Sequence, residues 1–415
     1  MRDIDFDSID WEAFRKENAE EIESINKTLE ELQKNKRLQR AIKKSKKRKF
    51  LELTKKSKNI NFDKNALVMP TKHVLRTLRH IYKNGYSNPS STYLDGQRAS
   101  ELVERARLKV SDALGCLPSE IFFTGGASES IAWVAKNYRI LADQRSHHAV
   151  LDAAEQSKNN DKAVFAFPWI VSETGECLAE EYEKKIKNKD TVMFADLTQA
   201  IGKEKIYLSQ YPGIKFACAS GQKIGGISGA GILYIKKKYQ DTIKPLIYGS
   251  QEDGFRGGTT NLPAIVCFAE AIEEATKDID KNQNKIRKVT NYIYTKIKTG
   301  DVIPVDDTPL FIYESIPVNV RMDEPYTNVI NITFNHLTAT AAVQIFDKLG
   351  FNISAGSACN SESERPSEAY LASGYTEDEA MRTIRISVGK NNTIREAKKF
   401  IKALKKIVAL YDEED

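Results

Sequence analysis

The feature that most constrains the fold is an alternation of short apolar runs with longer segments of helical composition. Residues 120–124, 191–195 and 231–235 are each expected to form a strand, and a helix is expected over residues 128–138. Strands that alternate with helices favour an α/β domain built on a mostly parallel sheet. With 415 residues, the chain is long enough for two domains.

Beyond about residue 262 the pattern changes. Helices dominate this part of the sequence, and residues 328–334 and 383–388 are the expected strands of a smaller α+β domain. We therefore predict a large α/β domain over residues 61–262 and a small C-terminal domain over residues 263–415.

Residues 1–60 are expected to form a charge-polarised extension. Residues 1–33 have a net charge of −7, whereas residues 34–58 hold thirteen bases and one acid. Both stretches lack Gly and Pro and are rich in helix formers, which predicts a largely helical extension. The basic stretch could pair with acidic groups of the same chain, bind an acidic protein, or bind nucleic acid. Nucleic acid is the least favoured partner, because Phe50 is the one aromatic residue available for base stacking.

Composition argues against several classes of protein. No run approaches the roughly 18 apolar residues that a membrane-spanning helix needs, and the acidic N-terminus lacks the apolar core of a secretory signal. Five cysteines without CxxC spacing argue for a reducing compartment and against a disulfide framework or a zinc site. We therefore expect a cytoplasmic protein with no bound metal and no membrane contact.

Three motifs at the ends of expected strands indicate chemistry. In Phe123-Thr-Gly-Gly-Ala-Ser-Glu-Ser130 a strand passes through two glycines into a helix, a natural phosphate site. Asp196 follows an apolar strand, where α/β folds place ligands, although it could instead cap a helix or a turn. Lys223 follows another apolar strand among small residues. It could be an ordinary exposed charge, or a partly desolvated amine that acts as a covalent nucleophile.

The three motifs are more informative together than singly. Their order is the one expected for pyridoxal phosphate in a large α/β domain. His147 lies between the phosphate loop and Asp196, where its ring could stack on a cofactor. Cys359 lies in the Gly- and Ser-rich loop of residues 354–361, a setting typical of a reactive thiolate that none of the other four cysteines has.

From about residue 85 to 405 the chain resembles the class V, fold-type I pyridoxal-phosphate family, and specifically the cysteine desulfurases of the iron–sulfur-assembly type. The Gly-Ser-Ala-Cys segment resembles the subgroup with a long cysteine loop. The resemblance implies a large domain with a mostly parallel sheet and a smaller α+β C-terminal domain. The matching segments are residues 87–91, 123–130, 146–151, 196–202, 220–223, 256–261, 356–359 and 384–387.

The resemblance implies roles for the residues around the cofactor ring. Lys223 would hold the cofactor covalently and move protons at the α-carbon of the substrate. Asp196 would pair with the pyridinium nitrogen, and Gln199 would hydrogen-bond the phenolic oxygen. His147 would stack on the ring and shuttle protons.

A second set of residues would bind the phosphate. The resemblance implies that Ala127, Ser128 and Ser220 contribute, and that Gln222 donates from its amide where the family usually has a charged histidine. Thr259 would reach the phosphate of a partner subunit, which implies a homodimer.

A third set would bind L-cysteine. Arg385 would clamp the substrate carboxylate, with Asn88 and Ser172 close by. Cys359 would attack the substrate sulfur, which leaves a persulfide on the enzyme and alanine as product. The persulfide would then pass to a sulfur-acceptor protein.

The sequence also departs from the family. An Asn usual near Ser172 is missing, the stretch between His147 and Ser172 is short, and residues 66–71 replace the usual Asp-x-x-Ala-Thr-Thr opening. These departures keep two alternatives open. One is a different class V enzyme, such as an aminotransferase or a selenocysteine lyase, and the other is a protein of the same fold that acts as a binding or structural component.

Overall fold

The computed structural model describes residues 58–299, 318–322, 328–356 and 366–411. By its internal contacts the chain divides into two units, and the described residues from Asn59 onward belong to the second. Residues 1–57 of the expected extension, with most of the basic stretch 34–58, lie outside the described residues. Cys359 lies outside them as well.

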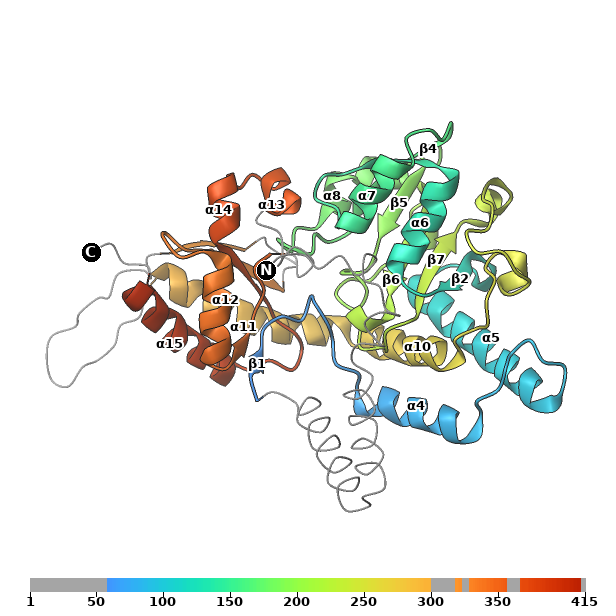
Figure 1. The fold of residues 1–415 in the computed structure, drawn as a ribbon, viewed down its shortest axis with the longest axis horizontal. Helices are drawn as coiled ribbons and strands as arrows, with labels where there is room; N and C mark the ends of the chain where they lie inside the picture. The colour runs from blue at the N-terminus through green and yellow to red at the C-terminus, as the bar shows by residue number, and fades with distance from the viewer. Residues whose placement is uncertain (1–57, 300–317, 323–327, 357–365, 412–415) are drawn as a thin grey trace, which may run out of the picture. The chain divides into compact units, whose positions relative to one another are not determined.

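A six-stranded sheet forms the centre of the larger part (Figure 1). Four of the six strands, β3 to β6, run parallel to one another, and β7 is antiparallel to both of its neighbours. The expected mostly parallel sheet is confirmed. The strands, in spatial order, are β2 (Ile121–Thr124), β7 (Gly231–Ile235), β6 (Ile214–Ser220), β5 (Met193–Asp196), β4 (Ala163–Pro168) and β3 (Arg139–Ala142).

Side chains alternate between the two faces of this sheet, because successive residues of a strand point in opposite directions. On β6, Ala217 and Ala219 pack in one hydrophobic cluster, whereas Phe216 and Cys218 pack in another. The helices of the first cluster are α5 (Leu94–Leu114) and α10 (Leu262–Thr276), with α4 (Lys72–Asn84) against α10. The second cluster contains α6 (Ala127–Asn137) and α7 (His148–Gln156). Two short helices follow β4, namely α8 (Leu178–Glu181) and α9 (Glu183–Lys187).

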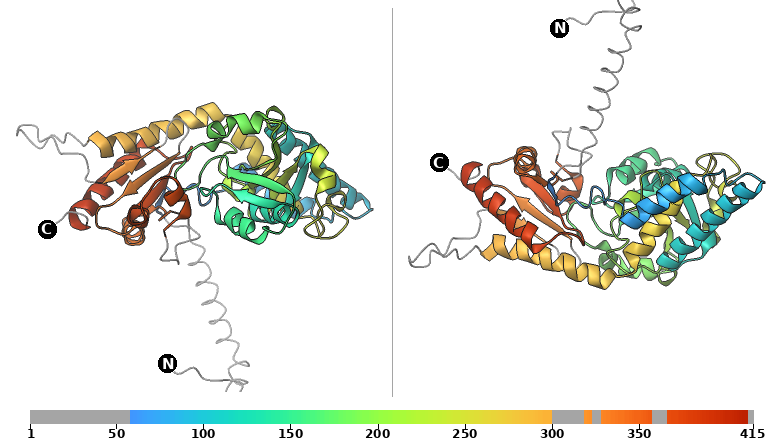
Figure 2. Two further views of the ribbon diagram at one scale, coloured as in Figure 1. Left: turned by 90° about the horizontal axis from the view of Figure 1, so that it is seen from above. Right: turned by 90° about the horizontal axis from the view of Figure 1, so that it is seen from below.

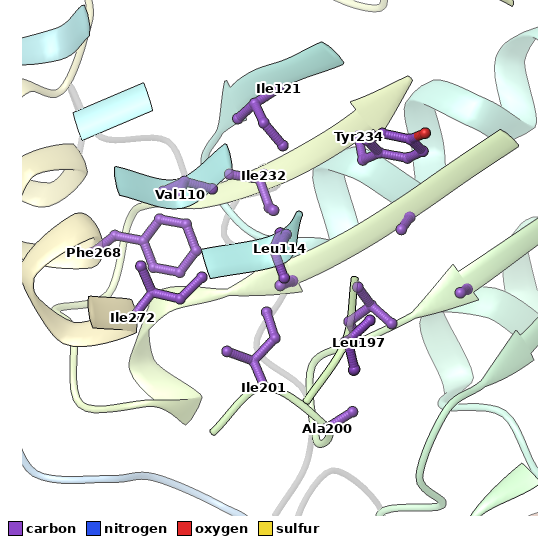
Figure 3. Packing of buried hydrophobic residues seen from close by; sticks show 14 of the residues in the cluster. Val110, Leu114, Ile121, Leu197, Ala200, Ile201, Ile232, Tyr234, Phe268 and Ile272 are labelled. Carbon is purple, nitrogen blue, oxygen red and sulfur yellow. The ribbon is translucent and has the colours of Figure 1, made fainter. Parts of the chain in front are cut away.

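Figure 3 shows the first cluster at close range. Leu114 of α5 and Phe268 of α10 lie against Ile232 of β7. All three side chains are almost completely buried. This packing fixes the carboxyl ends of the central strands, where the motifs predicted from the sequence are found.

The smaller part is built on a three-stranded antiparallel sheet, in the order β11 (Thr383–Ser387), β9 (Val329–Thr333) and β8 (Asn319–Arg321). A separate two-residue strand, β1 (Ile60–Asn61), pairs in parallel with β10 (Phe351–Asn352). The helices of this part are α11 (Ile279–Thr299), α12 (Ala339–Lys348), α13 (Glu368–Ala372), α14 (Glu377–Arg382) and α15 (Ile394–Tyr411).

The two hydrophobic cores do not follow the order of the chain strictly. Phe62, close to the start of the described residues, is fully buried in the core of the smaller part. Helix α10, which begins at the expected boundary near residue 262, packs in the core of the larger part. The precise domain limits stay a prediction, but the packing shows that residues 59–65 join the two parts. No helix among the described residues is both long and apolar enough to cross a membrane.

Candidate active site

The predicted site residues Asp196, Ser220 and Lys223 gather at the carboxyl ends of neighbouring strands. Asp196 is the last residue of β5, and Ser220 is the last residue of β6. The two strands are adjacent and parallel, so their ends meet at one edge of the sheet. Lys223 closes a short 3₁₀ turn, η4 (Gly221–Lys223), directly after β6. This edge is where open α/β sheets bind ligands.

The amine of Lys223 is half-buried and faces backbone oxygens. Its Nζ donates to the carbonyl oxygens of Asn65 and Ala66, each at 2.9 Å. Lys223 is therefore neither fully exposed nor fully buried. The two acceptors belong to the segment that connects the smaller part to α4, which holds Lys223 in place before any ligand is bound.

A polar network beside Lys223 includes three residues that sequence reasoning did not select, namely Asn65, Lys203 and Asn328. Gln199 donates from Nε2 to the Asn65 carbonyl at 3.0 Å. Lys203 donates from Nζ to Asn65 Oδ1 and to Gln199 Oε1, both at 3.1 Å. Asn328 adds a further donor to Asn65 Oδ1 at 3.0 Å. Asn65 is thus the common acceptor for side chains from three distant parts of the chain.

The electrostatic environment of Lys203 is unusual. Burial of the side chain lowers the pKa of Lys203 to about 7, and the positive charges of Arg385 and Lys223 act in the same direction. Burial disfavours the charged form of a lysine, and neighbouring cations disfavour it further. Near neutral pH this amine can therefore hold or release a proton within the network.

Arg385 is 2% exposed and lies on β11 of the smaller part. Its guanidinium pairs with Asp63 Oδ1 at 2.9 Å and donates to the carbonyl oxygen and the hydroxyl of Ser172, each at 3.3 Å. The Nε atom is buried and has no hydrogen-bond partner. A substrate carboxylate could reach this arginine by replacing Asp63 as its partner.

The predicted phosphate loop has the form of an open helix start. Helix α6 follows Gly126 without any side-chain cap, and the backbone N–H of Ala127 donates to Ser220 Oγ at 2.8 Å. Ser128 is exposed in the first turn of the helix. Gln222 has a buried Oε1 with no hydrogen-bond partner. The Ser128 hydroxyl, the first N–H groups of α6 and the positive end of the helix dipole suit a phosphate group, whereas the Gln222 Oε1 is an acceptor and does not.

Three other predicted residues lie on the surface. His147 is exposed and caps α7, with Nδ1 accepting from the Ala149 N–H at 3.1 Å. Asn88 and Thr259 are exposed loop residues, and Asn88 Oδ1 accepts from the Ser90 N–H. In the described part of the chain, no hydrogen bond joins any of these three residues to Lys223.

The cysteines that the structure describes are poor nucleophiles. Burial raises the pKa of Cys116 and of Cys177 to about 12, and that of Cys267 to about 11. Burial and the neighbouring Asp196 raise the pKa of Cys218 well above its usual range. All four are therefore protonated thiols at neutral pH, whereas the nucleophilic form is the thiolate.

The chain that leads to Cys359 starts beside Arg385. The backbone of Ser354 exchanges two hydrogen bonds with that of Arg385, at 2.7 and 3.2 Å. Gly356 then takes a positive φ of 76°, which L side chains rarely adopt. The described chain thus reaches Gly356 just after the backbone pairing of Ser354 with Arg385.

Comparison with known families accounts for this arrangement. A model of the family described as aminotransferase class-V matches residues 60–164 and 139–400. The chain belongs to the aminotransferase class-V family. The match begins at β1 and ends within α15, so it spans both parts of the described body.

Two similar proteins are both named as cysteine desulfurases. "Cysteine desulfurase IscS" of Methanosarcina thermophila is 26% identical over 389 residues, which cover 85% of this chain and 92% of that protein. "Cysteine desulfurase, mitosomal" of Trachipleistophora hominis is 26% identical, over 83% of this chain and 84% of that protein.

Two similar solved structures are both described as NifS-like proteins. A "NifS-like protein" has a TM-score of 0.73 at 26% identity, and covers 85% of this chain and 99% of its own. A NifS-like protein from Rickettsia africae has a TM-score of 0.71 at 25% identity, over 85% of this chain and all of its own.

Proposed function

We propose that this protein is a pyridoxal-phosphate-dependent cysteine desulfurase, which converts L-cysteine to L-alanine and keeps the sulfur as an enzyme persulfide. The observation that carries the proposal is a partly desolvated lysine, Lys223, between Asp196 and an open helix start at one edge of the sheet. Relatives named as cysteine desulfurases align with most of the chain.

The residues at this edge fit pyridoxal phosphate. The amine of Lys223 would hold the cofactor, the Asp196 carboxylate would pair with its ring nitrogen, and Gln199 would contact its phenolic oxygen. Ser128, Ser220 and the N–H groups that begin α6 would bind the phosphate, and Gln222 would donate to it from its amide nitrogen. When bound, the cofactor supplies an electron sink for charge that develops at the substrate α-carbon.

The protein itself would supply orientation and proton transfer. Arg385 would orient the substrate by its carboxylate, since a guanidinium binds carboxylates through two parallel hydrogen bonds. Lys223, once released from the Asn65 and Ala66 carbonyls, would move a proton at the α-carbon. Lys203 is connected to Lys223 through Asn65, to which both amines donate, and it can accept or return a proton near neutral pH.

Cys359 would take the sulfur. Its thiolate would attack the sulfur of the bound cysteine, so that a new S–S bond forms while the Cβ–S bond of the substrate breaks and alanine leaves after protonation. The high pKa values of Cys116, Cys177, Cys218 and Cys267 argue against any of these as the acceptor.

Two partners follow from the same proposal. A homodimer would bring the exposed Thr259 to the phosphate site of the second chain. The loop that carries Thr259 is held by an ion pair between Arg256 and Glu129 of α6 at 2.8 Å, next to the phosphate site of its own chain. A sulfur-acceptor protein would collect the persulfide from Cys359.

A direct test uses L-cysteine and three variants. The purified protein should release alanine and sulfide in the presence of a reductant and show the visible absorbance of lysine-bound cofactor. Cys359→Ser should keep this absorbance but lose sulfide release by orders of magnitude, because the covalent nucleophile is gone. Lys223→Ala should lose the absorbance itself. Cys116→Ser is the matched control and should retain both; near-normal sulfide release from Cys359→Ser would refute the proposal.

A further inference from the structure

Helices α11 and α15 concentrate positive charge to an unusual degree. Together they hold twelve lysines and arginines but two acids, Asp280 and Glu396, a net charge of +10. The net charge of the entire chain is +6. The remainder of the sequence is therefore net acidic, and this excess of cations is a local property of two helices.

The cations lie on the faces of α11 and α15 that point away from the core. On α15 the buried positions include Phe400, Leu404 and Ile407, which pack in the core of the smaller part. Ile286 and Ile293 of α11 pack in the same core. Exposed cations occupy the opposite faces, with the three- and four-residue spacing of one side of a helix. They are Lys281, Lys285 and Lys288 on α11 and Arg395, Lys398, Lys399, Lys402 and Lys406 on α15, and we call this set the basic helical face.

The two helices pack against each other and lie side by side (Figure 2). The α15 cations alone extend from Arg395 to Lys406, a rise of about 16 Å along the helix. Such a length corresponds to about five base-pair steps of a duplex, at 3.4 Å per phosphate on each strand.

Within the residues that the structure describes, none of the eight cations of the basic helical face forms an ion pair. The two acids are engaged elsewhere: Asp280 pairs with Lys205 at 2.6 Å, and Glu396 accepts from the N–H and the hydroxyl of Thr393. Uncompensated charge of one sign attracts a polyanion and raises its rate of association.

The face also lacks the groups that other partners require. Leu410 is the one large apolar side chain on the described parts of α11 and α15 that is strongly exposed. Protein interfaces depend on buried aromatic and aliphatic anchors. Membrane-surface helices insert Trp, Phe or Leu into the lipid, and single-stranded nucleic acid is bound by stacking bases on aromatic rings. A duplex backbone needs none of these, because it is held by phosphate contacts.

We propose that the basic helical face binds the sugar–phosphate backbone of double-stranded nucleic acid, without sequence preference. The binding energy would come from the release of counterions by phosphates that the lysines contact, and it would therefore fall steeply with salt. The face lies on helices outside the residues that we assign to cofactor and substrate. Duplex binding is thus separable from desulfuration.

The test compares two charge-matched variants of the full chain. In the first, Lys398, Lys399, Lys402 and Lys406 of α15 are changed to Ala. In the second, four exposed cations of α4 that also lack ion pairs, Lys72, Arg76, Arg79 and Lys83, are changed to Ala. Affinity for a 25-base-pair duplex of mixed sequence is measured by fluorescence anisotropy between 50 and 200 mM KCl. Circular dichroism and the cofactor absorbance establish that each variant is folded.

The α15 variant should bind the duplex at least tenfold more weakly than wild type at 100 mM KCl. Its plot of log affinity against log salt should be flatter by about 3–4, close to 0.9 for each lost phosphate contact. The α4 variant should keep the wild-type slope. If both variants lost duplex affinity equally, the effect would depend on net charge alone and the proposal would be wrong. It would also be wrong if the α15 variant bound the duplex as tightly as wild type. A third contrary result would be an α15 variant that loses affinity for phosphatidylserine vesicles or polyglutamate but not for the duplex.

Discussion

Lys203 belongs to no recognisable motif, yet its titration should affect the free energy of unfolding. Its amine joins Asn65 to Gln199, next to Lys223, and its surroundings lower its pKa to about 7. In the unfolded chain a lysine titrates near its ordinary pKa of about 10.4. Between these two values the unfolded chain binds the extra proton, and the free energy of unfolding must therefore rise with pH.

We expect this rise to disappear in Lys203→Met. Urea unfolding of wild type and variant at pH 7, 8.5 and 10 would measure it, because the difference between the two curves removes the contributions of groups that both proteins share. The wild-type advantage should increase steadily from pH 7 to 10. A difference that is constant over this interval would mean that the folded protein keeps Lys203 protonated. The parallel change Lys205→Met should keep the rise with pH, because the pairing with Asp280 raises the pKa of Lys205 and so acts in the opposite direction.

At the scale of elements, the phosphate site depends on how closely β7 approaches the start of α6. A Cβ on Gly231 would lie 2.5 Å from the carbonyl oxygen of Ala219 and 2.6 Å from the Cα of Gly126. Both neighbours are backbone, which cannot give way as a side chain can. Gly231→Ala should therefore cost about 1–3 kcal/mol of stability and displace the first turn of α6. The expected functional result is weaker cofactor binding, measured as a rise in the Kd of pyridoxal phosphate. Gly85→Ala is the control, since its Cβ would meet the nearest atom at an ordinary 4.0 Å.

Strands and strand-end motifs could be predicted from the sequence, whereas contacts between distant residues could not. The strand 231–235 was located to the residue, and the motifs around Asp196 and Lys223 do meet at one sheet edge, because short continuous apolar runs and the polar residues at their ends are local signals. Asn65 gave no such signal. It acts through partners 107 to 322 residues away, which become its neighbours when the chain folds. The ion pair between Asp63 and Arg385 was missed for the same reason.

At the scale of the whole molecule, residues 59–66 connect the two parts and the candidate site. Phe62 is buried in the smaller core, Asp63 pairs with Arg385, and the carbonyls of Asn65 and Ala66 hold Lys223. One short segment thus links the core of the smaller part to the lysine of the larger one. A change in the contacts of this segment should therefore affect both the core of the smaller part and Lys223.

This dependence gives a test based on two truncations. Deletion of residues 1–57 should leave cofactor binding and cysteine desulfuration close to wild type, because the hydrogen bonds described around Lys223 come from Asn65 onward. Deletion of residues 1–66 removes nine further residues and should abolish both, since it takes away a core side chain, the partner of Arg385 and the acceptors of Lys223. Cofactor absorbance and sulfide release measure the two outcomes. If the shorter deletion already abolished sulfide release from L-cysteine, the charged extension would have to contribute to the site itself. If the longer deletion retained it, the segment 59–66 would be dispensable and the role assigned to its contacts would be wrong.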